Sequence, residues 1–353
     1  MKKSRLKSLD FFRGFAISAM ILVNFIGSNS YNQLNHADWH GFTFADTIFP
    51  FFLWIIGVSI IFSFTKKLEK GFNKKEILLL IIKRSFILFI IGIFLNLLPY
   101  FDFASFRIMG VLQRIALTYL FAGIIVLYFK PRWQLITTIF ILLFYWLLII
   151  FAPGNLEMDN NFPGYIDQLI LGNRMYNEHF DPEGLLSTLP AITTILFGAF
   201  AGQIIINKKL KEKIKIKKLF YIGFLLLIIG LIWNIFFPIN KNLWTSSFSV
   251  FMSGLAFILF AIIYYLIDIK KYKLGFAFIV FGMNAITLYV TASLINKFVN
   301  LNIFNGSSLN YIIYNNLLFL SSKNAYLFIG LFYIFIIYLI AYFMYKKEWF
   351  LKV

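Results

Sequence analysis

Residues 48–98 of the chain read IFPFFLWIIGVSIIFSFTKKLEKGFNKKEILLLIIKRSFILFIIGIFLNLL, a sequence in which two apolar runs flank a basic connection. Each run, 48–65 and 77–98, is close to the length of about 20 residues that an α-helix needs to cross a bilayer. The connection KKLEKGFNKK at 66–75 is basic, as are the cytoplasmic loops of membrane proteins. The stretch therefore predicts two transmembrane helices joined by a cytoplasmic turn.

The composition of the whole chain excludes an ordinary soluble protein. Of its 353 residues, 60% are hydrophobic and only 14% are charged, too few to cover a soluble core of this kind. The chain contains no cysteine, which excludes disulfides, thiolate metal sites and a cysteine nucleophile. The net charge of +18 would also suit a nucleic-acid partner, but in a membrane protein it more often reflects cytoplasmic loops.

Ten apolar segments predict an all-α polytopic membrane protein with about ten transmembrane helices in a single domain, residues 1–353. The predicted spans are 11–27, 48–65, 77–98, 108–129, 133–152, 188–206, 219–237, 247–267, 276–297 and 324–345. An even number of spans places both termini on the same side of the membrane. The shorter segment 308–320 predicts an interfacial or re-entrant helix.

Lys and Arg concentrate in every second connection, which predicts the orientation. The basic connections are 2–7, 66–75, 130–132, 208–218, 270–273 and the C-terminal tail with Lys346, Lys347 and Lys352. The alternate connections contain only Arg107, Arg174, Lys241, Lys297 and Lys323. By the positive-inside rule both termini are cytoplasmic and the alternate loops are extracytoplasmic. The first span lacks an A-x-A-like cleavage site, so we expect it to be retained.

The loop LNHADWHGFTFAD, residues 34–46, contains two of the three histidines and lies on the predicted outer side. A histidine there can accept a proton at neutral pH or act as a nucleophile, and Asp38 or Asp46 can orient its ring. A zinc site would require His36 and His40 to lie on one helical turn, which Gly41 disfavours, so we expect no metal. A solvated loop histidine is the alternative.

Polar residues inside predicted spans are costly in hydrocarbon and usually functional. Amides can join helices and cations can extend to the interface, which suits Lys83. Arg114, several residues inside a span, instead predicts an anion or a water-filled cavity. Nine of the fifteen acids lie on the predicted outer side, which favours a cationic ligand such as a protonated amine. These features indicate a membrane enzyme or a transporter without identifying a substrate.

Seven blocks of the chain, in order, match the pattern of one known family. They are RLKSLDFFRGFAISAMILVNF (5–25), LNHADWHGFTFADTIFPFFLWIIGVSI (34–60), RIMGVLQRIALTY (107–119), GYIDQLILG (164–172), FDPEGLLSTLPAI (180–192), NKNLWTSSF (240–248) and GMNAITLYV (282–290). Together they resemble the heparan-α-glucosaminide N-acetyltransferase family. The resemblance implies that acetyl-CoA is the cytosolic co-substrate and that the amine of a glucosamine-containing saccharide is acetylated on the far side of the membrane.

The resemblance also implies catalytic residues. The family's essential histidine matches His36 in HADWHG, as general base or acetyl carrier, and its membrane asparagine matches Asn24. One residue more separates Asn24 from His36 than in the family pattern. Asn24 is expected to donate to the developing oxyanion, and Asp46 to orient His36 or to hold the ammonium.

Further residues are expected to bind the two substrates. For acetyl-CoA they are Arg13 and Arg84 at the inner mouth and Arg107, Arg114 and Asn284 along the channel. For the acceptor sugar they are Trp39 and the two carboxylates Asp181 and Glu183 of FDPEG, which flank a proline-fixed turn.

Lysosomal members of the family carry an additional luminal domain with its own membrane anchor, and luminal cysteines, whereas this chain begins almost at the shared core. We therefore expect a bacterial member in the cytoplasmic membrane, with an acceptor that need not be heparan sulfate. A homodimer stays an open alternative, as do two other functions. These are a transporter or flippase for a cationic or sugar-linked substrate, and an O-acyltransferase of a surface glycan.

Overall fold

A computed structural model of the chain describes residues 6–27, 29–302 and 306–351. Over these ranges it is helical, with isolated β-bridges between Asn161 and its neighbours Asn155 and Leu156 and no strand. Nine of the described helices are long and apolar enough to cross a membrane, and a bent pair can form a tenth span. The prediction of an all-α polytopic membrane protein is confirmed. Lys2, Lys3, Arg5 and Lys352, used to predict the orientation, lie outside the described residues, and the sidedness of the termini stays a prediction.

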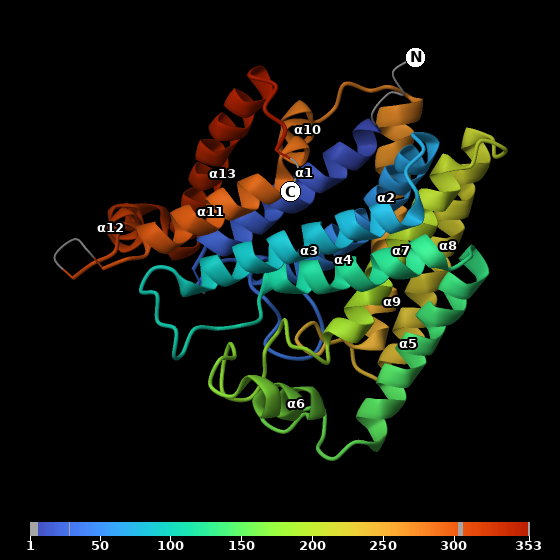
Figure 1. Ribbon diagram of the computed structural model, residues 1–353. Coiled ribbons are helices and arrows are strands. Elements are labelled where there is room, and N and C mark those ends of the chain that lie inside the picture. The colour runs from blue at the N-terminus through green and yellow to red at the C-terminus, as the bar shows by residue number, and fades with distance from the viewer. Residues whose placement is uncertain (1–5, 28, 303–305, 352–353) are drawn as a thin grey trace. The chain divides into compact units, whose positions relative to one another are not determined.

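The long helices follow the predicted spans closely (Figure 1). They are α1 (Lys7–Phe25), α2 (Phe44–Glu69), α3 (Lys74–Leu97), α4 (Val111–Tyr128), α5 (Pro131–Phe151), α7 (Thr188–Ile206), α8 (Glu212–Asn234), α9 (Ser246–Tyr264), which η2 (Tyr265–Ile269) extends, and α13 (Ser322–Lys346). The shorter elements are η1 (Asn32–Leu34), α6 (Phe162–Leu171), α10 (Phe276–Met283), α11 (Ala285–Val299), α12 (Leu309–Asn316) and η3 (Leu318–Leu320).

The segment predicted as one span at 276–297 is two helices, α10 and α11, bent by 87°. The break falls at Asn284, whose buried side chain bonds the main chain of the tail. Its Nδ2 donates to the Trp349 carbonyl at 2.9 Å, and its Oδ1 accepts from Leu351 N–H at 3.0 Å. The Asn284 side chain at the break therefore satisfies two main-chain groups of the C-terminal segment.

The described residues form two compact units. Unit 1 comprises those within Met1–Ala37, Phe42–Phe52 and Ile263–Val353. Its helices α1 and α10 touch through glycines: a Cβ on Gly14 would lie 1.7 Å from the Phe278 carbonyl oxygen, and one on Gly282 would lie 1.8 Å from that of Asp10. Such small residues let membrane helices approach closely.

Unit 2 comprises Asp38–Gly41 and Leu53–Ile262. Helices α2 and α7 meet in the same way, because a Cβ on Gly57 would lie 1.9 Å from the Ile195 carbonyl oxygen. Hydroxyls join α7 to α9, with Thr193 Oγ1 and Ser249 Oγ 2.8 Å apart. The short helix α6, which follows α5 in Figure 1, begins at Phe162, which packs against the buried cluster of Tyr145, Ile149 and Phe237.

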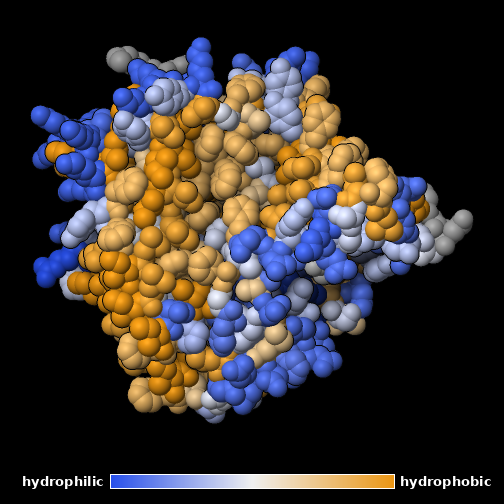
Figure 2. Space-filling model, turned by 180° about the vertical axis from the view of Figure 1, so that it is seen from behind, coloured by the Kyte–Doolittle hydropathy of each residue, from blue (hydrophilic) through white to orange (hydrophobic). Residues whose placement is uncertain are grey.

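Large apolar side chains are exposed on α3, α5 and α8. Examples are Leu79, Phe86, Phe140, Phe151, Tyr221 and Phe224. Figure 2 shows that apolar side chains cover much of one face of the molecule, with hydrophilic side chains grouped apart from them. Soluble proteins rarely expose apolar areas of this extent, whereas lipid-facing helices require them.

Candidate active site

Asp46, the third residue of α2, fixes the loop that precedes this helix. Its Oδ2 accepts hydrogen bonds from the main-chain N–H groups of Ala37 and Thr43, each at 3.0 Å, and from Thr43 Oγ1 at 3.2 Å. The bond from Thr43 N–H to the Asp46 side chain is one half of a capping box, and an acid in the first turn complements the helix dipole. The side chain is almost fully buried, so these donors replace the water that a carboxylate requires.

The other carboxylate oxygen of Asp46 bonds His36. The distance between Asp46 Oδ1 and His36 Nδ1 is 2.7 Å. An ionised carboxylate can only accept, so Nδ1 carries the proton and Nε2 presents its lone pair. The His36 side chain is 50% exposed, so the ring is oriented from one side and accessible from the other. This is how a carboxylate orients the base in catalytic triads, and the ring can accept a proton or attack an acyl carbon.

Asn24 lies in the same unit, near the end of α1, and is exposed. Its carbonyl accepts a hydrogen bond from the Asn296 side chain. No hydrogen bond joins the Asn24 side chain to His36 in the described part of the chain. The structure therefore brings together His36 and Asp46 of the three predicted catalytic residues.

Arg13 and Asn284, two residues predicted to bind acetyl-CoA, also lie in unit 1. Arg13 Nη1 contacts Asp10 Oδ1 at 3.3 Å and donates to the Gly282 carbonyl at 3.2 Å, next to the α10–α11 break. Asn284 is the residue at that break, and its amide bonds the C-terminal segment. Both residues therefore lie at the discontinuity in the helix.

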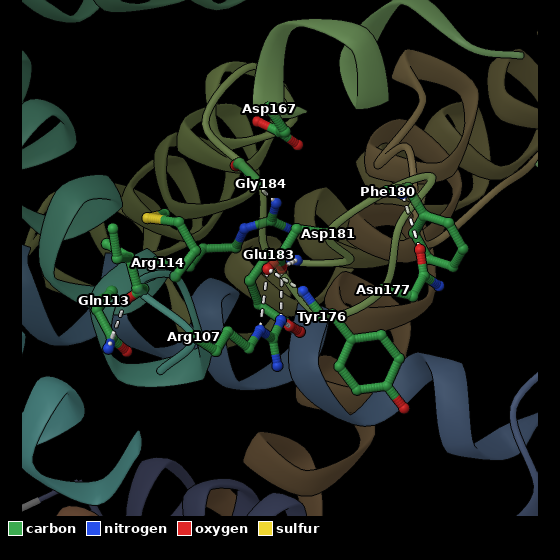
Figure 3. A network of polar contacts seen from close by, with 12 residues as sticks. Arg107, Gln113, Arg114, Asp167, Tyr176, Asn177, Phe180, Asp181, Glu183 and Gly184 are labelled. Atoms are coloured by element: carbon green, nitrogen blue, oxygen red, sulfur yellow. Dashed lines mark hydrogen bonds and ion pairs between the residues drawn. The ribbon is translucent and has the colours of Figure 1, made fainter. Parts of the chain in front are cut away.

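A second polar cluster lies in unit 2 and centres on Arg107 (Figure 3). Its Nε donates to Asp181 Oδ2 at 2.9 Å, and its Nη2 donates to Asp181 Oδ1 and Glu183 Oε2, each at 2.5 Å. The Tyr176 ring covers the guanidinium at 4.8 Å. Burial alone would lower the pKa of Arg107, but the two carboxylates outweigh it and raise the pKa.

The two carboxylates are engaged within this cluster. Asp181 also accepts from the main-chain N–H groups of Glu183 at 2.9 Å and Tyr176 at 3.0 Å, so it has four donors. Burial would raise the pKa of Glu183, but the charges of Arg107 and Arg114 outweigh it and lower the pKa. A ligand amine would compete with Arg107 for these oxygens, and Arg107 and Tyr176 are the more accessible part of the cluster.

Arg114, in α4, is fully buried beside this cluster. Its Nη2 donates to the Gly184 carbonyl at 3.1 Å and to Ser187 Oγ, and its guanidinium lies 5.1 Å from the Trp244 ring. The structure gives this arginine a carbonyl, a hydroxyl and an aromatic face, while its Nε and Nη1 are buried without a hydrogen-bond partner among the described residues. The anion or water-filled cavity expected at this arginine stays a prediction.

The segment Asp38–Gly41 of the opening loop belongs to unit 2. Trp39 Nε1 donates to the Leu156 carbonyl at 2.6 Å, and its ring meets that of Phe180 edge to face at 4.9 Å. Burial lowers the pKa of His40, against the opposing charge of Glu157. Trp39 therefore supports the loop that follows His36.

The remaining predicted residue, Arg84 in α3, lies over the Tyr119 ring at 4.9 Å. Among the described residues, no group of three or more His, Asp or Glu side chains is arranged to bind a metal ion.

Two residues outside the predicted site, Thr43 and Asp167, contact members of it or the turn that carries them. Thr43 stands three residues before Asp46 in the pattern T-x-x-D, which is the signal of a capping box. Asp167 is an acid on the amphipathic segment GYIDQLILG. The structure buries it, and its Oδ1 accepts a hydrogen bond from Leu185 N–H at 2.8 Å.

The chain is similar in sequence to a family of known enzymes and to two of its mammalian members. The family model described as "Heparan-alpha-glucosaminide N-acetyltransferase, catalytic" matches residues 5–238, which include the His36–Asp46 pair and the Arg107 cluster. The heparan-alpha-glucosaminide N-acetyltransferase of Mus musculus is 31% identical over 348 residues, and that of Homo sapiens is 32% identical over 350 residues. Each match covers 81% of this chain and 53% or 52% of the relative, so the chain spans about half the length of the curated relatives it matches. The chain belongs to the heparan-α-glucosaminide N-acetyltransferase catalytic family.

Proposed function

We propose that the protein is a membrane acetyltransferase that moves an acetyl group from cytosolic acetyl-CoA to the amine of a glucosamine-type sugar on the extracytoplasmic side. The observation that carries the proposal is the contact between His36 Nδ1 and Asp46 Oδ1 at 2.7 Å, within the residues matched by the family. A transporter has no need of an accessible histidine oriented by a buried carboxylate. An acyltransferase requires one, because its acceptor amine must lose a proton.

The proposed role of His36 is that of a base. At neutral pH an amine of this type is mostly protonated, and only the neutral form can attack a thioester. Nε2 of His36 takes a proton from the ammonium and passes it to solvent. The amine nitrogen then bonds the acetyl carbon, Nε2 takes the second proton from this nitrogen, and the imidazolium gives it to the thiolate as the carbon–sulfur bond breaks. In the alternative order, Nε2 attacks the acetyl carbon first and the thiolate of CoA leaves, and the neutral amine then takes the acetyl group from the imidazole.

Asn24 is proposed to donate a hydrogen bond to the oxyanion that forms at the acetyl carbonyl. Removing one such donor typically lowers the rate by about 10²–10³. For the phosphates of CoA we propose Arg13 and Arg84. The predicted orientation puts both in the cytoplasmic halves of their helices, α1 and α3, and arginine binds phosphate well through its planar donors.

For the acceptor we propose the Arg107 cluster together with Trp39. Since Asp181 and Glu183 are engaged by Arg107, their proposed role is to hold the guanidinium in place. The accessible edge of Arg107 and the Tyr176 ring then contact the sugar. Arg114 and Asn284 are proposed to line the path of the acetyl donor, and the lipid environment is a bacterial cytoplasmic membrane.

The test is to replace His36 by Ala in detergent-purified protein. Acetyl-CoA should still raise the melting temperature, since the donor site does not depend on His36, while transfer to glucosamine should fall by about 10² or more, as for the loss of a positioned base. His40→Ala and His179→Ala are matched controls and should retain substantial activity. A His36→Ala protein that acetylates glucosamine at a near-normal rate would contradict the proposal, and absence of any effect of acetyl-CoA on wild-type melting would favour a transporter.

A further inference from the structure

Helix α6 places a buried carboxyl against the turn that carries the Arg107 partners. Asp167 Oδ1 accepts from Leu185 N–H at 2.8 Å. Its Oδ2 lies so close to Gly184 that a Cβ on that residue would be 1.8 Å away. We call residues 181–188 the 181–188 turn. Asp167 therefore contacts this turn at two successive residues, Gly184 and Leu185.

The 181–188 turn transmits this contact to Arg107. Gly184 N–H donates to the Asp181 carbonyl at 2.9 Å, and the Gly184 carbonyl accepts from Arg114 Nη2 and from Thr188 Oγ1 at 2.7 Å. Asp181 and the nearby Glu183 bind Arg107 directly. A displacement of Gly184 would therefore shift both ends of the turn, including the carboxylates that hold Arg107.

The surroundings of Asp167 disfavour its ionised form. The groups that act on it are the main-chain amides of Leu185 and Leu186, the carboxylate of Asp181 and the guanidinium of Arg114, and the charge of Asp167 in turn acts on Tyr145 of α5. Burial is the largest influence and, with the negative charge of Asp181, raises the pKa of Asp167 to about 7, although the amides and Arg114 oppose it.

We propose that Asp167 is a positioning residue whose protonated carboxyl supports the 181–188 turn, so that loss of this proton loosens the support of Arg107. The protonated acid keeps one oxygen for Leu185 N–H and adds no further negative charge beside Asp181. The ionised form would add a third carboxylate to a buried cluster that already contains Asp181 and Glu183. Protonation near neutral pH therefore controls how firmly the acceptor side of the site is held.

The sign of the effect on stability follows from linkage. The folded protein binds this proton more tightly than the unfolded chain does, so the contribution of Asp167 to stability falls as pH rises. The fall begins near the ordinary value of 3.8 and ends above about pH 7, where both states have lost the proton.

Asp167→Asn is the test variant, because asparagine keeps the shape and the acceptor oxygen but has no proton to lose. The melting temperature of this variant minus that of wild type should increase from about pH 5 to about pH 7 and stay constant above it. Asp159→Asn, which alters an exposed acid in the same region, is the matched control and should give a difference independent of pH. An Asp167→Asn difference that is also independent of pH would overturn the proposal.

Hydrogen exchange of the wild-type protein gives a second measurement that needs no variant. Protection of the amides in 181–188, corrected for the intrinsic rate, should decrease as pH rises through about 7, while protection in α3 should not. Equal pH dependence in both segments would overturn the proposal even if Asp167→Asn does not fold.

The activity test rests on the proposed function. The KM of wild type for glucosamine should increase above about pH 7, and that of Asp167→Asn should not, while the effect of acetyl-CoA on melting should be the same in both. A protein without transferase activity that shows the melting and exchange differences would contradict the proposed function and support the role of Asp167. Transfer with the same pH dependence of KM in both proteins would overturn the role of Asp167 and leave the function standing.

Discussion

Replacing Asp46 by Asn tests the orientation of His36 directly. The buried carboxylate accepts from His36 on one oxygen and from Ala37 and Thr43 on the other. An asparagine has one oxygen and one NH₂ group for these two sides. It must therefore present a donor either to the two main-chain N–H groups or to the histidine ring.

The free-energy costs of the two amide orientations determine which one forms. Turning the NH₂ group toward Ala37 and Thr43 would leave two partly buried N–H groups without this acceptor, at up to about 1–3 kcal/mol each. Turning it toward His36 costs less, because the ring can move its proton from Nδ1 to Nε2 and accept at Nδ1. The second arrangement leaves Nε2 protonated and unable to act as a base. We therefore expect Asp46→Asn to fold and to lose about 10²–10⁴ in rate.

The assay is transfer of acetyl from acetyl-CoA to glucosamine by detergent-purified protein near neutral pH. Binding of acetyl-CoA, measured by its effect on the melting temperature, should be nearly unchanged and reports that the variant is folded. Asp38→Asn, an exposed acid in the same loop, is the matched control and should keep most of the activity. An Asp46→Asn protein with a rate within a few fold of wild type would refute the role of this carboxylate in selecting the tautomer.

Three further predictions concern topology, donor binding and stability. A cysteine introduced at Asn32 should react with an impermeant maleimide in intact cells and one at Lys211 only after permeabilisation, and the opposite pattern would reverse the orientation. Arg13→Gln and Arg84→Gln should each raise the KM for acetyl-CoA without changing that for glucosamine, and unchanged values for the donor in both would move its phosphates elsewhere. Arg107→Gln should lower the free energy of unfolding by about 3–5 kcal/mol because it strands two buried carboxylates, and an unchanged melting temperature would contradict this.

The positions of the spanning helices could be read from the sequence with small errors. The span predicted at 188–206 is α7 (Thr188–Ile206). Residues 48–98 form most of α2 and α3, which flank the basic turn. A segment in hydrocarbon must satisfy its own backbone hydrogen bonds, which it does by forming a helix. Its length and hydropathy are therefore sufficient to predict its position. The sequence did not reveal the bend at Asn284, where the side chain bonds the main chain of residues more than 60 positions later.

The sequence by itself also determined which residue types could perform the chemistry: His36 beside two acids, and the FDPEG carboxylates. It could not determine the partners. That Asp46, and not Asp38, bonds His36 depends on the turn before α2, and that Asp181 and Glu183 bind Arg107 depends on contacts across 74 and 76 residues. Local sequence patterns are sufficient to predict membrane helices, because each segment must keep its backbone polar groups and its charges out of lipid independently of the other segments. The pairing and burial of polar side chains arise only when distant segments remove one another from water, and this was decided by the tertiary structure.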